Sequence, residues 1–169
     1  TVGKNKISVS GITVKDWTTG ETIPGGKAEY FPYVTFKADA EQKFSITAKN
    51  GYQIPNLEYS VNNGKWATVV ADTEIPFGGA NGNLRLRGTG NTNGTSSADT
   101  ENMTENTYGY SKISFSNNAE VECEGDIRTL LDYRTYKTVN TNEARFFRLF
   151  YACGQLISAP DLPATNLAK

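Results

Sequence analysis

The sequence contains no histidine among its 169 residues. Histidine is the commonest general base near neutral pH, a frequent zinc ligand and the usual partner of a serine or cysteine nucleophile. Carboxylate pairs or lysine can still support catalysis, but most single-domain chemistries that depend on an imidazole are excluded. We therefore expect a protein that is not an enzyme, with no cofactor and no bound metal.

Cysteines and long apolar runs are also scarce. Cys123 and Cys153 are the two cysteines, too few for a disulfide scaffold, and the sequence leaves open whether they pair. No apolar run approaches the roughly 20 residues that a membrane-spanning helix needs, so we expect no membrane insertion. The sequence starts at Thr1 without a basic-then-apolar leader, so any export signal is expected to lie outside it.

Neither sign of charge is in excess. The 17 lysines and arginines nearly balance the 18 aspartates and glutamates, which leaves a net charge of -1. Nucleic acids and anionic membranes favour basic surfaces, so we expect no nucleic-acid partner. Residues 88–107 hold Met103 as their only large apolar residue, and this composition predicts a long polar loop.

The sequence does contain many short runs in which apolar and polar residues alternate. Examples are "KFSITAK", "NLRLRG" and "YGYSKISFS", separated by turns rich in Gly, Pro and Asn. In "LEYSVNNGKWATVV" two such runs flank Asn62-Asn63-Gly64, which predicts a tight hairpin because Asn and Gly tolerate positive φ angles. The pattern predicts a mainly β chain, either an antiparallel β-sandwich or small β-modules in tandem.

After Gly125 the pattern becomes helical. "DIRTLLDYRTY" predicts a short helix or turn. A second helix is predicted from Asn142 to Cys153, with Asn142 as the N-cap and Gly154 as the stop. Its apolar residues cover too much of the circumference for a solvated helix, so we expect it to be nearly buried.

The last 21 residues, "LFYACGQLISAPDLPATNLAK", resemble the repeat unit of the BspA-like leucine-rich-repeat surface proteins of gut and oral anaerobes. Residues 56–140 are similar to the β-module that precedes those repeats, and residues 1–55 to an Ig-like or B-repeat-like module. The resemblance implies three parts: a β-module at 1–55, a β-module at 56–140 with its polar loop at 88–107, and one repeat unit, the start of a solenoid, at 141–169. One unit cannot bury both of its faces alone.

The resemblance also implies a function. It points to an extracellular protein of the bacterial cell surface that binds a host or microbial surface protein or glycan, with the β-modules as spacer and cap. The single unit has two interpretations: either further repeats follow in a longer chain, or the open edge docks on another chain or a second copy. The alternative function is a structural subunit of an extracellular assembly, such as a pilus, a surface layer, a phage fibre or a capsid decoration, which self-assembles through the repeat edge.

Three sets of candidate site residues follow. Aromatic residues that could stack on a sugar, or else form core and cross-strand pairs, are Trp17, Trp66, Tyr108 and Tyr110. Apolar residues expected to bury against neighbouring repeats are Phe146, Phe147, Phe150, Leu156, Leu162 and Leu167. Carboxylates that could bind calcium, or else form a solvated outer face, are Glu120, Glu122, Glu124 and Asp126, with a second oxygen-rich group in the polar loop at Asp99, Glu101, Asn102 and Glu105.

Overall fold

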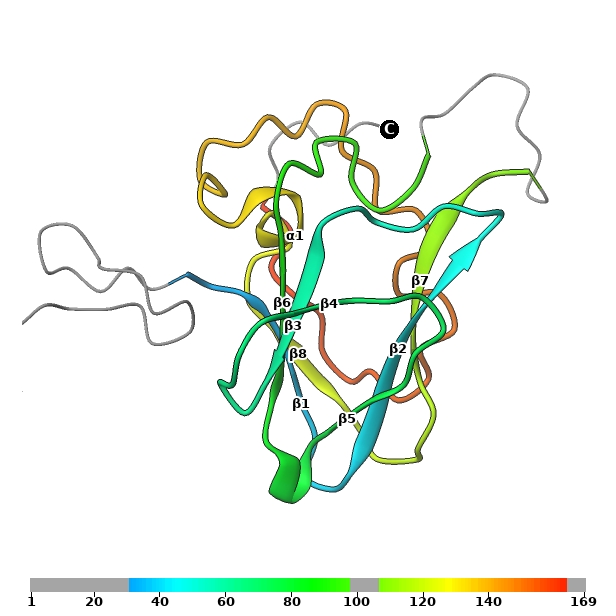
Figure 1. The fold of residues 1–169 in the computed structure, drawn as a ribbon, viewed down its shortest axis with the longest axis vertical. Coiled ribbons are helices and arrows are strands. Elements are labelled where there is room, and N and C mark those ends of the chain that lie inside the picture. Colours follow the sequence, from blue (N-terminus) through cyan, green and yellow to red (C-terminus); the bar gives the residue numbers. More distant parts are fainter. Residues whose placement is uncertain (1–30, 98–106, 164–169) are drawn as a thin grey trace, which may run out of the picture. The chain divides into compact units, whose positions relative to one another are not determined.

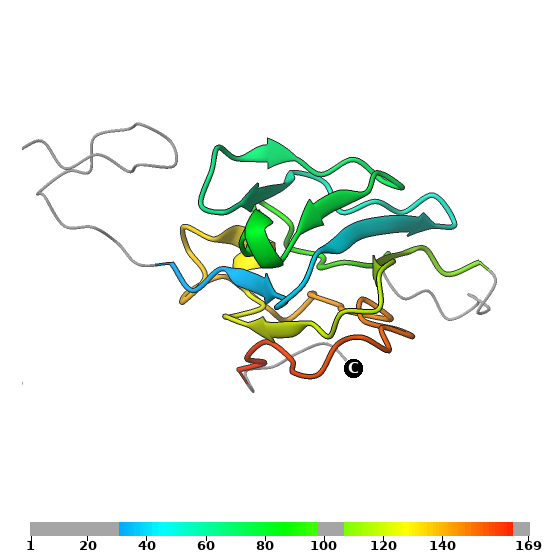
Figure 2. The same ribbon diagram turned by 90° about the horizontal axis from the view of Figure 1, so that it is seen from below.

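The computed structural model describes residues 31–97 and 107–163 (Figures 1 and 2). All of them belong to one compact unit, Phe31–Lys169. Trp17, Leu167, the strands expected before residue 31 and the oxygen-rich group at 99–105 lie outside the described residues.

The larger of two antiparallel sheets has the strand order β4-β3-β6-β1-β8. Its strands are β1 (Val34–Lys37), β3 (Leu57–Val61), β4 (Ala67–Thr68), β6 (Leu84–Gly88) and β8 (Glu122–Glu124). Phe36 on β1 shows the register of the sheet: it lies opposite Leu84 on β6 and opposite Cys123 on β8. All three side chains are almost fully buried, as expected for one face of a packed sheet.

The smaller sheet has the order β5-β2-β7, with β2 (Gln42–Lys49), β5 (Ile75–Phe77) and β7 (Tyr110–Phe115). On β2 the apolar side chains alternate strictly, so Phe44 and Ile46 face inward. They lie opposite Phe115 and Ile113 on β7. Alternation of this kind is what the sequence "KFSITAK" predicted.

Phenylalanine rings join the two sheets. The ring centroid of Phe36 on β1 lies 5.7 Å from that of Phe44 on β2 and 5.3 Å from that of Phe115 on β7. Phe77 on β5 lies 6.0 Å from Phe115. Each buried ring contributes about 1.5–3 kcal/mol through burial alone. The mainly β fold with antiparallel sheets is therefore confirmed, and it is consistent with a β-sandwich.

The expected boundary at residue 55 does not divide the described residues. Strands β1 and β2 precede it, yet β1 pairs with β6 and β8, and β2 pairs with β5 and β7. Residues on both sides of position 55 therefore share both sheets and one core. The boundary came from a resemblance between separate stretches of sequence, and such a resemblance does not show which distant strands pair.

The short helix predicted after Gly125 is present as α1 (Thr129–Asp132), which packs against β6. Gly88 at the end of β6 allows this contact, because a Cβ there would clash with the carbonyl oxygen of Leu130. Asn91 fixes the same helix through its side-chain amide, which donates to the Leu130 carbonyl at 2.9 Å.

The helix predicted from Asn142 to Cys153 is wrong, since these residues form successive turns. Arg148 and Ala152 have φ angles of 54° and 56°, which are incompatible with a right-handed helix. Backbone groups that a helix would use are taken by neighbouring strands and loops. The Leu149 carbonyl accepts from the Ile113 N–H at 2.8 Å, and the Arg145 carbonyl accepts from the Thr95 N–H at 2.7 Å. Figure 1 shows this orange segment beside β7.

Candidate functional site

The segment from Leu156 to Asp161 lies parallel to the stretch that contains β8. Val121 forms a parallel bridge with Leu156, and Asp126 forms one with Asp161. Between these two bridges, the Cys123 N–H donates a hydrogen bond to the Ser158 hydroxyl, 35 residues later in the sequence. The register is constant along the whole contact, because each of the three pairs is separated by that same number of residues. Figure 2 shows the red C-terminal segment running along this side of the unit.

Hydrogen bonds hold this contact at both ends and in the middle. The Val121 N–H donates to the Gln155 carbonyl at 2.8 Å, and its carbonyl accepts from the Ile157 N–H at 2.9 Å. In the middle the Ser158 hydroxyl replaces a backbone group, because it accepts from the Cys123 N–H at 2.7 Å and donates to the Cys123 carbonyl at 2.9 Å. The contact is a ladder in which one side chain takes the place of the main chain.

The predicted repeat residues divide into two groups. Half-buried side chains that pack against the core are Phe146, Phe150 and Leu156. Two others face solvent: Phe147 is 40% exposed and Leu162 is 54% exposed, and Ile157, which the sequence analysis did not single out, is 56% exposed. The segment therefore has one side on the sandwich and one side that carries exposed apolar residues.

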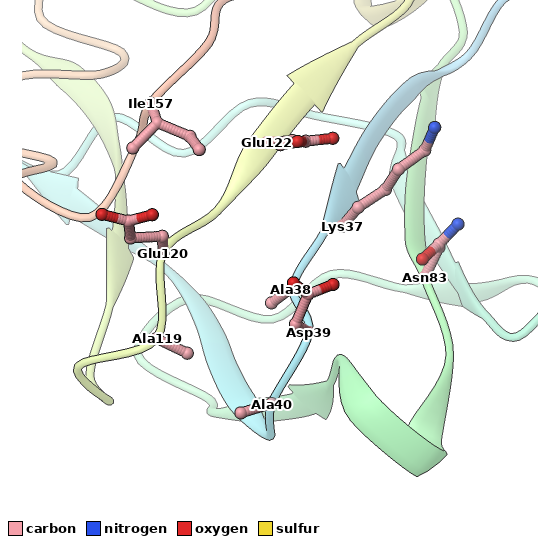
Figure 3. A pocket seen from close by; sticks show the side chains of 9 residues that line it. All are labelled: Lys37, Ala38, Asp39, Ala40, Asn83, Ala119, Glu120, Glu122 and Ile157. Atoms are coloured by element: carbon pink, nitrogen blue, oxygen red, sulfur yellow. The ribbon is translucent and has the colours of Figure 1, made fainter.

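A pocket of about 530 Å³ lies next to this segment (Figure 3). It lies between the end of β1, the turn that follows it and the residues around the start of β8. Lys37, Asp39, Glu120, Glu122 and Ile157 are among its lining residues. In Figure 3 Glu120 lies near Ile157. Glu122 projects from β8 toward β1, the strand that carries Lys37. The pocket is rich in carboxylates, with one lysine at its edge.

The acidic row was predicted to bind calcium or to form a solvated outer face. Glu122 and Glu124 are exposed, whereas Val121 and Cys123 between and beside them are buried. Glu124 pairs with Lys37 at 2.6 Å. Within residues 31–97 and 107–163, no group of three or more acidic or cysteine side chains is placed to hold a metal ion. The exposed Glu120, Glu122 and Glu124 fit the outer-face interpretation. Asp126 does not, because it is only 7% exposed and forms an ion pair with Arg128 at 2.7 Å.

Trp66 is half-buried in a cluster of aromatic and cationic side chains. Its ring lies 5.0 Å from that of Tyr33, and the Arg87 guanidinium lies 4.2 Å above it. The Arg87 guanidinium also lies 4.6 Å from the Tyr133 ring and forms an ion pair with the Glu58 carboxylate at 2.8 Å. Arg87 is only 7% exposed. The cluster fits the cross-strand interpretation of Trp66 rather than an exposed platform. Alternation in "NLRLRG" places Arg87 on the outer face of the strand, so this burial could not be predicted from the sequence pattern.

Tyr108 and Tyr110 lie together with Phe147, although the sequence placed the tyrosines and the phenylalanine in different sites. The Phe147 ring lies 4.7 Å from that of Tyr108 and 5.5 Å from that of Tyr110. Arg148 lies 4.7 Å from the Tyr151 ring, which also contacts Lys112 at 5.7 Å. Arg148, Tyr151 and Lys112 were missed, because only the fold brings β7 and residues 147–151 together.

The two cysteines do not form a disulfide. Burial, with a smaller contribution from Glu124, raises the pKa of Cys123 from 9.0 to about 12. Burial also raises the pKa of Cys153, against an opposing effect of Lys112, and its Sγ donates to the Ile113 carbonyl at 3.0 Å. Both thiols therefore act as packing groups rather than nucleophiles.

No protein-family model, no curated protein and no solved structure matches the chain. Among the described residues, no helix is both long enough and apolar enough to cross a bilayer.

Proposed function

We propose that the β-sandwich caps a leucine-rich-repeat array in a non-enzymatic, extracellular protein of the bacterial surface that acts by adhesion or ligand binding. One observation carries this proposal: residues 156–161 lie parallel to residues 121–126 at a constant separation of 35 residues. Solenoids are built in this way, because each unit places one strand parallel to the equivalent strand of the unit before it.

The packing of the first unit supports the role of a cap. β8 pairs with β1 on one side, and the stretch around it bonds residues 155–161 on the other. Phe146, Phe150 and Leu156 then cover apolar surface of the sandwich that water would otherwise reach. A repeat array needs such a cover at its first unit, since an open apolar end favours aggregation.

The ligand of the proposed array is a protein or glycan of a host or microbial surface. This part of the proposal comes from the resemblance of the last 21 residues to BspA-like repeats. The lack of histidine in the sequence supports a role in binding rather than catalysis. The exposed side of the C-terminal segment, with Ile157 and Leu162, is where the second unit would stack.

The reading frame past Lys169 provides the first test. The proposal expects further copies of the Ala-Pro, Leu-Pro-Ala-Thr unit, and a stop codon directly after Lys169 would contradict the array. The encoded protein is then displayed on a non-adherent bacterium, in full and ended at Lys169. We expect attachment to mucin, matrix protein or other microbes only with the full array. Equal attachment by both would contradict it.

A structural subunit is the second candidate, and the exposed Ile157 and Leu162 on the C-terminal segment favour it. In that case this exposed side of the segment would contact a second copy of the chain. Sedimentation velocity over a range of concentrations separates the two candidates. Oligomers that grow with concentration and disappear in Ile157→Asp would support assembly, whereas a monomer at every concentration would exclude it.

A further inference from the structure

Cationic and aromatic side chains gather on the outer face of β2 and β7. The strand register pairs Lys49 with Tyr110 and Thr47 with Lys112, so these side chains share one face. The opposite face carries Ile46 and its partner on β7, which are buried in the core. We refer to the following six residues as the β7 surface, in which Tyr110 is only 7% exposed and forms the base beneath the others: Lys49, Tyr110, Lys112, Phe147, Arg148 and Tyr151.

The turns after residue 145 supply half of this surface. Arg148 adopts a positive φ of 54°, and the next residue, Leu149, bonds to the edge of β7. The Arg148 guanidinium consequently lies 5.8 Å from the Tyr110 ring and 5.2 Å from the Phe147 ring. Tyr151 projects beyond it and is 54% exposed. The surface is thus a row of rings with positive charges set between them.

The six residues of this surface include cations and no carboxylate, whereas the whole chain has a net charge of -1. Lys49, Lys112 and Arg148 contribute three cations. Glu74, an acidic residue next to β5, is held at the other end of β7 by Lys43 at 2.9 Å and by Ser116 at 2.8 Å. Three carboxylates that would repel an anion, Asp39, Glu120 and Glu122, line the separate pocket beside β8. The cations of the β7 surface would therefore attract an anionic partner to this face.

We propose that the β7 surface binds an acidic glycan, and this inference rests on the proposed function in adhesion because it names the chemical class of one ligand. A sugar ring presents a flat C–H face that stacks on Tyr151 or Phe147. The carboxylate or sulfate projects from the edge of the sugar ring. With the sugar stacked on Tyr151, this group would lie near the Lys112 ammonium, which is 5.7 Å from the Tyr151 ring. An acidic peptide has no flat apolar face beside its carboxylates, so it would match the charges but leave the rings unused.

The test uses the intact chain and four probes in a titration by calorimetry. Dextran sulfate provides sulfates, hyaluronan oligosaccharides provide carboxylates, dextran provides neutral sugar and polyglutamate provides charge without sugar. We expect binding to at least one acidic glycan that weakens as NaCl is added, and none to dextran. Binding to neither acidic glycan, or tighter binding to polyglutamate than to both, would overturn the proposal. The two glycan arms show whether sulfate or carboxylate is preferred.

Variants localise the binding. Lys112→Gln and Tyr151→Ala are each expected to weaken glycan binding about two- to fivefold, the effect of losing one exposed ionic or cation–π contact. Lys137→Gln is the matched control, because Lys137 lies 5.6 Å from the Tyr136 ring in another part of the unit. Unchanged affinity in both β7-surface variants, or an equal loss in the control, would overturn the assignment. Lys49→Gln, at an exposed strand end, replaces either variant that fails to fold.

Failure of this inference can be told apart from failure of the proposed function. If the array-bearing protein adheres while the intact chain binds none of the acidic glycans, only the glycan assignment falls. If the chain binds acidic glycans through the β7 surface while adhesion does not depend on the repeats, only the role of the array falls.

Discussion

At the residue scale, Gly125 is the point where three segments of the chain meet. Its φ is 96°, and a Cβ there would clash with the carbonyl oxygen of Tyr33. Its own carbonyl accepts from the Asp161 N–H at 2.7 Å. The turn after β8 therefore depends on the absence of a side chain, both for its backbone angle and for the space it needs.

Gly125→Ala should lower the free energy of unfolding by about 2–3 kcal/mol, because it adds both a strained φ and a steric clash. Urea denaturation followed by circular dichroism measures this loss. Gly154→Ala is the control, since the described part of the chain places no atom within 4 Å of a Cβ built there. Equal stability of the two variants would contradict the role of Gly125.

Cys123 provides a pH-dependent prediction. Its pKa is about 12 in the folded chain, against 9.0 for an unperturbed thiol. The unfolded chain therefore loses this proton first, so the stabilisation is complete below pH 9 and is lost as the pH rises. Between about pH 8 and pH 10 the unfolding free energy should fall by about 1 kcal/mol more in the natural chain than in Cys123→Ala. Parallel slopes in the two proteins would contradict this effect.

At the element scale, local patterns predicted local structures correctly. In the hairpin between β3 and β4, Asn62 and Asn63 have φ angles of 49° and 56°, and the Gly64 N–H donates to the Val61 carbonyl at 2.9 Å. These are the angles of a type I′ turn, which suits the twist of a hairpin. The alternating strands and α1 were predictable for the same reason, because their signals lie within a few residues.

The helix expected at Asn142–Cys153 failed because its signals were local while its partners are distant. The segment was expected to be nearly buried, but only part of it is: Leu149 is buried, whereas Phe147 and Tyr151 are exposed. The Leu149 carbonyl accepts from the Ile113 N–H rather than from a donor within a helix. The candidate site shows the same limit. Tyr108 and Tyr110 could be picked from the sequence, but the cations around Tyr151 could not, because only tertiary packing unites them.

Ser158 tests the C-terminal ladder. Ser158→Ala removes both hydroxyl bonds to Cys123 and should lower the local stability of residues 155–161 by about 1 kcal/mol. Hydrogen exchange should show faster exchange there, with little change in β2. Ser158→Thr retains a hydroxyl and should exchange like the natural chain. A uniform increase over the whole unit would indicate global destabilisation instead.

At the scale of the whole molecule, residues 141–163 pack onto the sandwich and add buried side chains to its core. Ala144 and Leu149 are each 1% exposed, and the segment satisfies the backbone of β7 and of the stretch around β8. A repeat unit that folded as a separate domain would leave the sandwich intact when removed. The two arrangements predict different behaviour of a shortened chain.

A chain ended at Asn140 should lose several kcal/mol of stability, since it exposes the contacts of Leu149 and leaves the Ile113 and Val121 N–H groups without partners. Denaturation followed by tryptophan fluorescence measures the loss. The change should appear as an earlier and broader transition. An unchanged midpoint would show that residues 141–169 are a separate unit after all.

The parallel contact between residues 121–126 and 156–161 also has a consequence for the length of the proposed repeat array, if further units stack in the same way. Neighbouring strands lie about 4.8 Å apart, so every added layer lengthens the molecule by only that amount. The 35 residues between the two stacked stretches would reach about 120 Å if they were fully extended. Stacking therefore uses many residues for a small increase in length. The array that we propose would therefore bind its ligand along the side of the stack, and the distance between that side and a cell surface would have to come from another part of the polypeptide.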